Sequence, residues 1–142
     1  MTSVTDTQRR VDQASGLAKV LDAAYDAFED MLTAVYGYHD SGGPFYPALI
    51  MAAAGAANGR DAVAFAPSLP PMSRTLQATV VPAPDPPGWQ DLGASIVSLS
   101  SSLSARLRDV AAAAETAEDR RACLDAARYA EEVHGLAAAS LQ

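Results

Sequence analysis

Glu131 and His134 are the residues of this sequence whose types and spacing come nearest to a metal site. A Glu-x-x-His step brings a carboxylate and an imidazole to one side of a helix. Di-iron carboxylate bundles carry this step on two helices, with a glutamate from each of the other two. Here the step occurs once, and residues 45–58 supply no carboxylate. His39 is the third candidate ligand. Because the ligand set is incomplete, we expect no cofactor, and a metal-dependent enzyme is the least favoured function.

A nucleophile with a base beside it is the other common basis of catalysis, and the sequence shows no such pattern. The serine run at 100–102 lacks both the Gly-x-Ser-x-Gly elbow and a Ser-x-x-Lys partner. Cys123 falls on the apolar arc of a predicted helix, where a thiol behaves as a small hydrophobic group. The His39-Asp40 pair lies in a turn with no nucleophile motif near it. We therefore expect a protein that is not an enzyme.

Composition excludes further classes. Of the 142 residues, 17 are acidic and 10 are basic, which gives a net charge of −7. This balance argues against a nucleic-acid binder, because phosphates require a basic face. One cysteine forms neither an internal disulfide nor a thiolate zinc site. No secretory leader is visible, and no apolar run reaches the roughly 18 residues of a membrane span. We expect a cytoplasmic protein with no membrane segment.

The elements that would position these residues are predicted to be helices, and the first two lie before residue 60. Apolar residues recur at steps of three and four from 7 to 37, with acidic residues opposite, which indicates one amphipathic helix that ends at Gly37. Residues 45–57 carry no charge, so we expect a second helix that is buried on every side as the centre of the core. Asn58-Gly59 is expected to end it.

Two further helices are predicted after residue 87. Residues 88–114 carry a seam of apolar side chains at heptad-like spacing, which is typical of helix-to-helix packing: Leu92, Ile96, Leu99, Leu103, Leu107, Val110 and Ala114. Thr116 is a suitable N-cap for a helix over 116–139. One bent helix over 92–139 is an alternative that the sequence leaves open.

Residues 60–87 separate the second and third predicted helices and hold seven of the nine prolines. They are incompatible with one regular helix. The stretches 62–66 and 75–81 alternate weakly and are candidates for a short β-hairpin. We therefore predict an all-α protein, a single domain over residues 1–142, folded as a four-helix bundle with a long Pro-rich crossover. A symmetric dimer that shares the third-helix seam is equally consistent.

The expected function is non-enzymatic: a helical bundle that acts through protein–protein interaction or self-association, with a homodimer expected and no nucleic-acid or membrane partner. An alternative is a binder of an apolar small molecule in an interhelical pocket. The candidate interaction or pocket residues are the aromatic side chains around the uncharged helix and the charge pair within this region: Tyr36, Phe45, Tyr46, Phe65, Arg60 and Asp61.

Overall fold

The computed structural model describes residues 4–40, 47–70 and 88–141, and these residues form five helices and no strands. The helices are α1 (Val4–Gln13), α2 (Leu17–Asp40), α3 (Pro47–Ala64), α4 (Trp89–Ala113) and α5 (Ala117–Ser140). The all-α prediction is confirmed for these residues. The prediction of four helices is wrong, because the first predicted helix is divided in two.

Gly16 is where the first predicted helix divides. Its φ of +86° lies in the left-handed region, which glycine enters without steric cost. Its carbonyl accepts from the amide of Val20 at 3.0 Å, so α2 starts there in a new direction. α2 then continues through Gly37 to Asp40, three residues beyond the predicted end.

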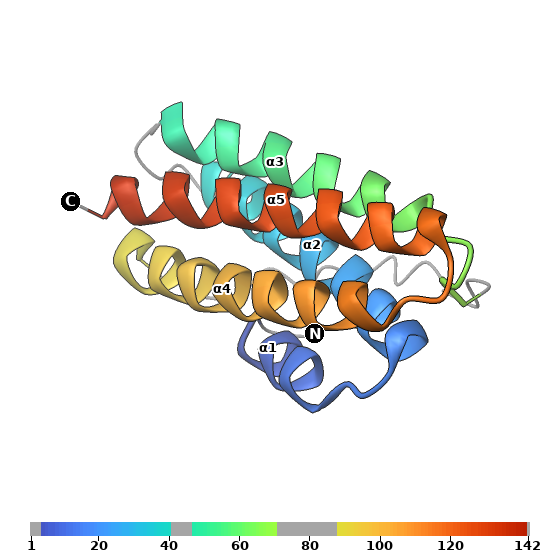
Figure 1. Ribbon diagram of the computed structural model, residues 1–142. Helices are drawn as coiled ribbons and strands as arrows, with labels where there is room; N and C mark the ends of the chain where they lie inside the picture. The colour runs from blue at the N-terminus through green and yellow to red at the C-terminus, as the bar shows by residue number, and fades with distance from the viewer. Residues whose placement is uncertain (1–3, 41–46, 71–87, 142) are drawn as a thin grey trace.

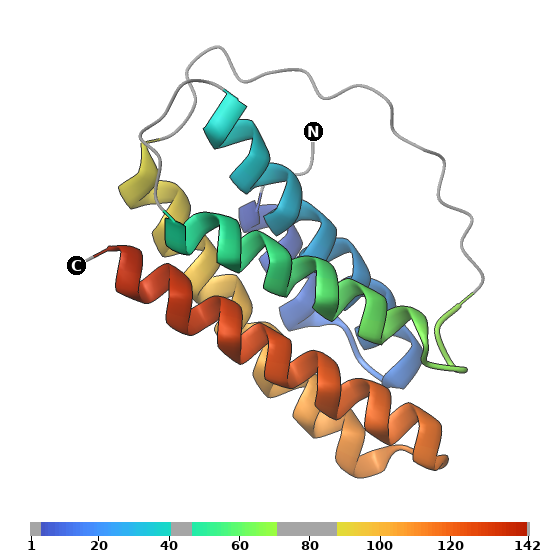
Figure 2. The same cartoon turned by 90° about the horizontal axis from the view of Figure 1, so that it is seen from above.

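The helices are stacked so that α5 lies between α3 and α4 (Figure 1). Behind these three helices in the view of Figure 1, α2 contacts both α3 and α4. The short helix α1 packs against both α2 and α4 (Figure 2). The largest fully buried side chains come from α1, α2, α3, α4 and α5 alike, so there is one shared core; among them are Phe28, Leu21, Met31, Ile96, Leu99, Leu103 and Leu107. Buried alanines line the facing sides of α3 and α5, which lets these helices approach closely.

α3 does not stop at Asn58-Gly59, as predicted, but continues to Ala64. Gly59 is buried against α2, and this contact offsets the low helix propensity of glycine. The extension also removes the first half of the predicted hairpin. Residues 62–64 are helical, and Phe65 and Ala66 form a closing turn through their amides to Ala62 and Val63. The second half, at 75–81, lies outside the described residues.

α3 is also not the central element that its uncharged sequence predicts. Only one of its faces is buried, and Ile50 and Met51 are exposed on the other. The central position belongs to α5, whose eight buried residues face α3 on one side and α4 on the other. Small side chains explain the difference, because alanine is accommodated at a surface as readily as in a core.

The two C-terminal helices agree best with the prediction. The predicted seam of α4 is buried from Leu92 to Leu107. Thr116 is the N-cap of α5, and its hydroxyl accepts from the amide of Asp119 at 3.1 Å. Ala114 is extended, with ψ of 134°, so α4 and α5 are separate helices rather than one bent helix. None of the helices in the described ranges is long and apolar enough to cross a membrane.

Candidate interaction surface

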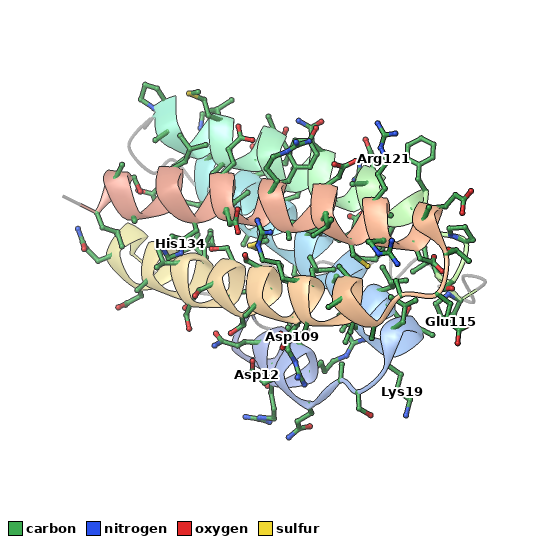
Figure 3. The ribbon with its side chains drawn as sticks, in the orientation of Figure 1. Asp12, Lys19, Asp109, Glu115, Arg121 and His134 are labelled. Carbon is green, nitrogen blue, oxygen red and sulfur yellow. The ribbon has the colours of Figure 1, made fainter. Side chains whose placement is uncertain are left out.

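Glu131 and His134, the two residues of the Glu-x-x-His step, each contact α4, but at different places and with different partners. Arg108 donates two hydrogen bonds to the carboxylate of Glu131, at 2.8 and 2.9 Å, and Ser104 donates a third at 2.9 Å. These bonds hold the pKa of Glu131 below its usual value, with Arg108 as the main cause. His134 lies between α5 and α4, and its Nδ1 is 3.2 Å from the carbonyl oxygen of Val97 (Figure 3).

The remaining chemical candidates do not complete a site. His39 is exposed at the end of α2. Within the described ranges, no three side chains of His, Cys, Asp or Glu come together as a metal site. Cys123 is fully buried, which confirms the prediction of a core thiol. Desolvation, with a smaller contribution from Asp119, raises the pKa of this thiol to about 11.

The exposed face of α3 is the most unusual surface that the structure describes. At 100° per residue, seven positions share this face and are exposed. We call them the α3 stripe: Pro47, Ile50, Met51, Ala54, Asn58, Asp61 and Phe65. Ile50 is 38% exposed, Met51 56% and Phe65 83%. Three large exposed apolar side chains on one side of α3 and of the turn after it make the stripe the candidate interaction surface.

Packing of the opposite face fixes the direction of the α3 stripe. That face is buried against α2 and α5 along the whole helix: Leu49, Ala52, Ala53, Gly55, Ala56, Gly59 and Val63. A side chain at Gly55 would stand only 3.1 Å from Cγ2 of Val133, and one at Gly59 would overlap the ring of Phe28. Rotation of α3 would break these two close contacts, so the stripe stays outward.

Phe65 is positioned by a clasp between the turn after α3 and the first turn of α5. The backbone amide of Ser68 donates to Oδ1 of Asp119 at 3.0 Å, and its hydroxyl donates to Oδ2 at 2.6 Å. Asp119 is buried, and the Ser68 hydroxyl is the main cause that lowers the pKa of its carboxyl. This clasp attaches the turn that carries Phe65 to the body of the protein.

A shallow groove lies beside Phe65, between the C-terminal end of α3 and the start of α5. Its volume is about 270 Å³, and its lining includes Ala62, Glu118, Arg121 and Asp125. Figure 3 shows Arg121 reaching from α5 toward the C-terminal part of α3. A second open groove, of about 280 Å³, lies over Arg108, Arg120 and Leu124 between α4 and α5. Both are below the roughly 300–1,000 Å³ typical of pockets that enclose a small molecule.

The arginines near the borders of the α3 stripe form ion pairs with carboxylates. On the α2 side, Arg60 is bound by Glu29 at 3.0 Å and by Asp61 at 3.3 Å. On the α5 side, Asp125 pairs with both Arg121, at 3.8 Å, and Arg128, at 3.3 Å. The three arginines of these pairs are therefore already bound to carboxylates.

Two further acids on the α5 side lack such a partner. Glu118 lines the groove beside Phe65. The Cδ atom of Glu132 would be 4.0 Å from a side chain at Gly55. Across the part of the chain that the structure describes, neither forms an ion pair. The stripe is therefore apolar near its two ends, polar at Asn58 and Asp61 between them, and bordered by acidic side chains.

The candidate residues from the sequence are distributed unevenly over this surface. Phe65 and Asp61 belong to the α3 stripe, and Arg60 borders it. Tyr36 is exposed, but it lies on α2. Phe45 and Tyr46 lie outside the described residues. Sequence reasoning missed Ile50 and Met51. Asn58 and Asp61, polar and on the same side of the helical wheel, were the available signal that this side faces solvent.

Comparison with models of known protein families gives no match, and neither the curated proteins nor the solved structures contain one. The function is therefore argued from the surface itself.

Proposed function

We propose that this chain is a non-enzymatic helical protein that acts by binding another protein through the α3 stripe. The observation that carries the proposal is the outward position of Ile50, Met51 and Phe65 on a single rigid face. Burying such side chains contributes roughly 25 cal/mol for each Å² of apolar surface removed from water. Aromatic residues and methionine are also the apolar types that protein interfaces favour.

The clasp at Asp119 supports the same function. Because Ser68 ties the turn to α5 through two hydrogen bonds, Phe65 is held in its exposed position before any partner binds. A backbone that is already ordered loses less conformational entropy on binding. This is the arrangement of an anchor residue rather than of a side chain that is exposed by chance.

The helices that carry the stripe form the second part of the proposal. We propose that α2 to α5 act as a four-helix bundle to which α1 is added, joined by a Pro-rich crossover that begins after Ala64. The acidic composition and single buried thiol fit a cytoplasmic protein. Self-association through the α3 stripe is the second form that this contact can take. The apolar-ligand alternative has less support, because the two grooves described above are shallow and open.

The experiment is an affinity capture that compares three forms of the protein in extracts of the cells from which it comes. They are the natural chain, the double variant Met51→Ser/Phe65→Ser and the control Leu124→Ser. Leu124 is exposed on the second groove, away from the stripe. We expect a defined partner that the natural chain and the control retain and the double variant loses. Native mass spectrometry of each form reports self-association.

Equal capture by all three forms would overturn the proposal. The comparison is valid if the three forms have the same circular dichroism spectrum and the same unfolding midpoint, which shows that all three are folded. We expect this result, because exposed side chains contribute little to stability.

A further inference from the structure

We propose that the occupant of the α3 stripe is an amphipathic helix of a partner protein, with an apolar stripe bordered by basic residues. This inference rests on the proposed function and names the chemistry of its partner. It follows from three features of the described residues: the shape of the stripe, its area and the charges along its edges.

The shape fits one helix lying along another. From Pro47 to Phe65 the stripe follows α3 and the residue after it over 18 residue steps, or about 27 Å at 1.5 Å per step. Bulky apolar side chains stand near its two ends, Ile50 and Met51 at one and Phe65 at the other. Between them lie the small Ala54, where a second helix can approach the backbone, and the polar Asn58 and Asp61, which would face polar or basic side chains of that helix. Exposed positions at steps of three and four along one helix face are the spacing at which a second helix packs.

The area argues against a second copy as the occupant. A stripe about 27 Å long on a helix about 10–12 Å wide offers roughly 300 Å². Stable interfaces between folded proteins bury about 800 Å² on each partner. Two copies of this chain that met only through their α3 stripes would therefore lack the contact area of a stable dimer. A helix of about 18 residues matches the stripe in length and also reaches the groove beside Phe65, and at this area its binding is expected to be transient.

The charges select a basic partner. Five carboxylates border or interrupt the stripe, against three guanidinium groups that are already paired with some of them. The five are Glu29, Asp61, Glu118, Asp125 and Glu132. The whole chain also carries a net charge of −7, so two copies repel each other and a basic helix is attracted. Lysine or arginine on the border that faces α5 would meet Glu118 and Glu132, which form no ion pair within the described ranges. On the other border, the nearest carboxylates are Glu29 and Asp61, which share Arg60.

Two synthetic peptides of 18 residues test the inference. The first has leucine along one helical face and lysine on its borders, and the second has the same leucines with glutamate in place of lysine. Cys123 is buried and its thiol has a raised pKa, so Ala64→Cys, at the exposed last position of α3 beside the stripe, is expected to be labelled selectively by a fluorescent dye. The same dye on Ala105→Cys, an exposed position of α4, is the control.

We expect the lysine peptide to change the dye signal at position 64 but not at 105. We also expect its affinity to exceed that of the glutamate peptide by at least about tenfold, or about 1.4 kcal/mol. The variant Met51→Ser/Phe65→Ser should weaken this binding by a similar factor, and Leu124→Ser should leave it unchanged.

Three outcomes would overturn the inference. They are equal affinity for the two peptides, binding that survives in the serine double variant, and a dimer that the double variant abolishes. The proposed function would survive any of these outcomes if the affinity capture still finds a partner that binds the natural chain and not the double variant. Loss of the stripe-dependent partner would remove the proposed function whatever the peptides do, so the two failures are distinguishable.

Discussion

The ring of Phe28 on α2 lies directly against the backbone of α3 at Gly59. A side chain built on Gly59 would place its Cβ 2.4 Å from Cε1 and 2.5 Å from Cζ of this ring. Phe28 is fully buried, so its ring has no open space into which to move. The missing side chain of Gly59 is therefore the reason that α2 and α3 approach closely here, and the contact holds α3 with its stripe outward.

Gly59→Ala is expected to destabilise the fold. The added methyl group forces Phe28 or α3 to shift, and overpacking of this kind costs about 1–3 kcal/mol. Gly135→Ala is the matched control, since Gly135 lies on α5 and a Cβ there meets no atom within 4 Å. Alanine in an exposed helix interior is about 0.5–1 kcal/mol better than glycine. Urea unfolding followed by circular dichroism should therefore give opposite signs for the two variants.

Arg106→Met is expected to loosen α1. The Arg106 guanidinium donates to the carbonyl oxygens of Val11, at 3.2 Å, and of Asp12 and Ala14, both at 2.6 Å. These carbonyl groups lie in the last turn of α1 and just after it. The last carbonyls of a helix have no hydrogen-bond donor within the helix. Methionine keeps the aliphatic stem and removes the donors. Hydrogen bonds from a charged group contribute about 1.5–3 kcal/mol, so we expect a loss of this order with faster amide exchange across residues 4–13.

Arg108→Met is the control for this experiment. Arg108 and Glu131 form an exposed ion pair, and such pairs contribute about 0–1 kcal/mol. If Arg106→Met costs no more than Arg108→Met and leaves amide exchange in α1 unchanged, the anchoring role of Arg106 is wrong.

Asp119→Asn is expected to destabilise the protein at neutral pH but not in acid. Hydrogen bonds lower the pKa of Asp119 in the folded state. A lowered pKa contributes stability above the unfolded-state pKa of about 3.9, and this contribution is lost as the pH falls through the folded-state pKa. The difference in unfolding free energy from the natural chain should be about 1–3 kcal/mol at pH 7. It should shrink steadily below about pH 4.

Asp30→Asn provides the opposite case. Partial burial raises the pKa of Asp30, and the carboxylates of Asp26 and Glu29 add to the effect, although Thr7 donates a hydrogen bond to it. A raised pKa means that ionisation costs stability as the pH rises through the unfolded-state value. Asp30→Asn should therefore stabilise the protein at pH 7 and have little effect at pH 3. Loss of stability at pH 7 would show that the charge of Asp30 is needed by the fold.

Cys123 is expected to react only when the protein unfolds. Its thiol is buried and has a pKa of about 11, so very little thiolate forms at pH 8. Labelling with a thiol reagent should be slow in buffer and complete in concentrated urea. In intermediate urea, the labelling rate should follow the unfolding equilibrium measured by circular dichroism. Fast labelling in buffer would mean that α5 opens locally at Cys123.

Helix content and the packing of the last two helices could be predicted from the sequence, because both depend on residues that are close along the chain. The apolar seam from Leu92 to Leu107 repeats at helical spacing and is buried as expected. Thr116 caps α5 with the residue type that a cap requires. Cys123 lies on the apolar arc where periodicity placed it. Local pattern alone determined these features.

Only the tertiary structure decided which helices are interrupted and which faces remain open. Gly16 breaks one predicted helix, while Gly59 lies within another without ending it. The difference is that Gly59 has Phe28 packed against it and Gly16 has no atom near its missing side chain. The alanines of α3 fit a core or a surface equally well, so sequence pattern could not show that Met51 faces outward. Exposure depends on which partners a face meets in three dimensions, and those partners are distant along the chain.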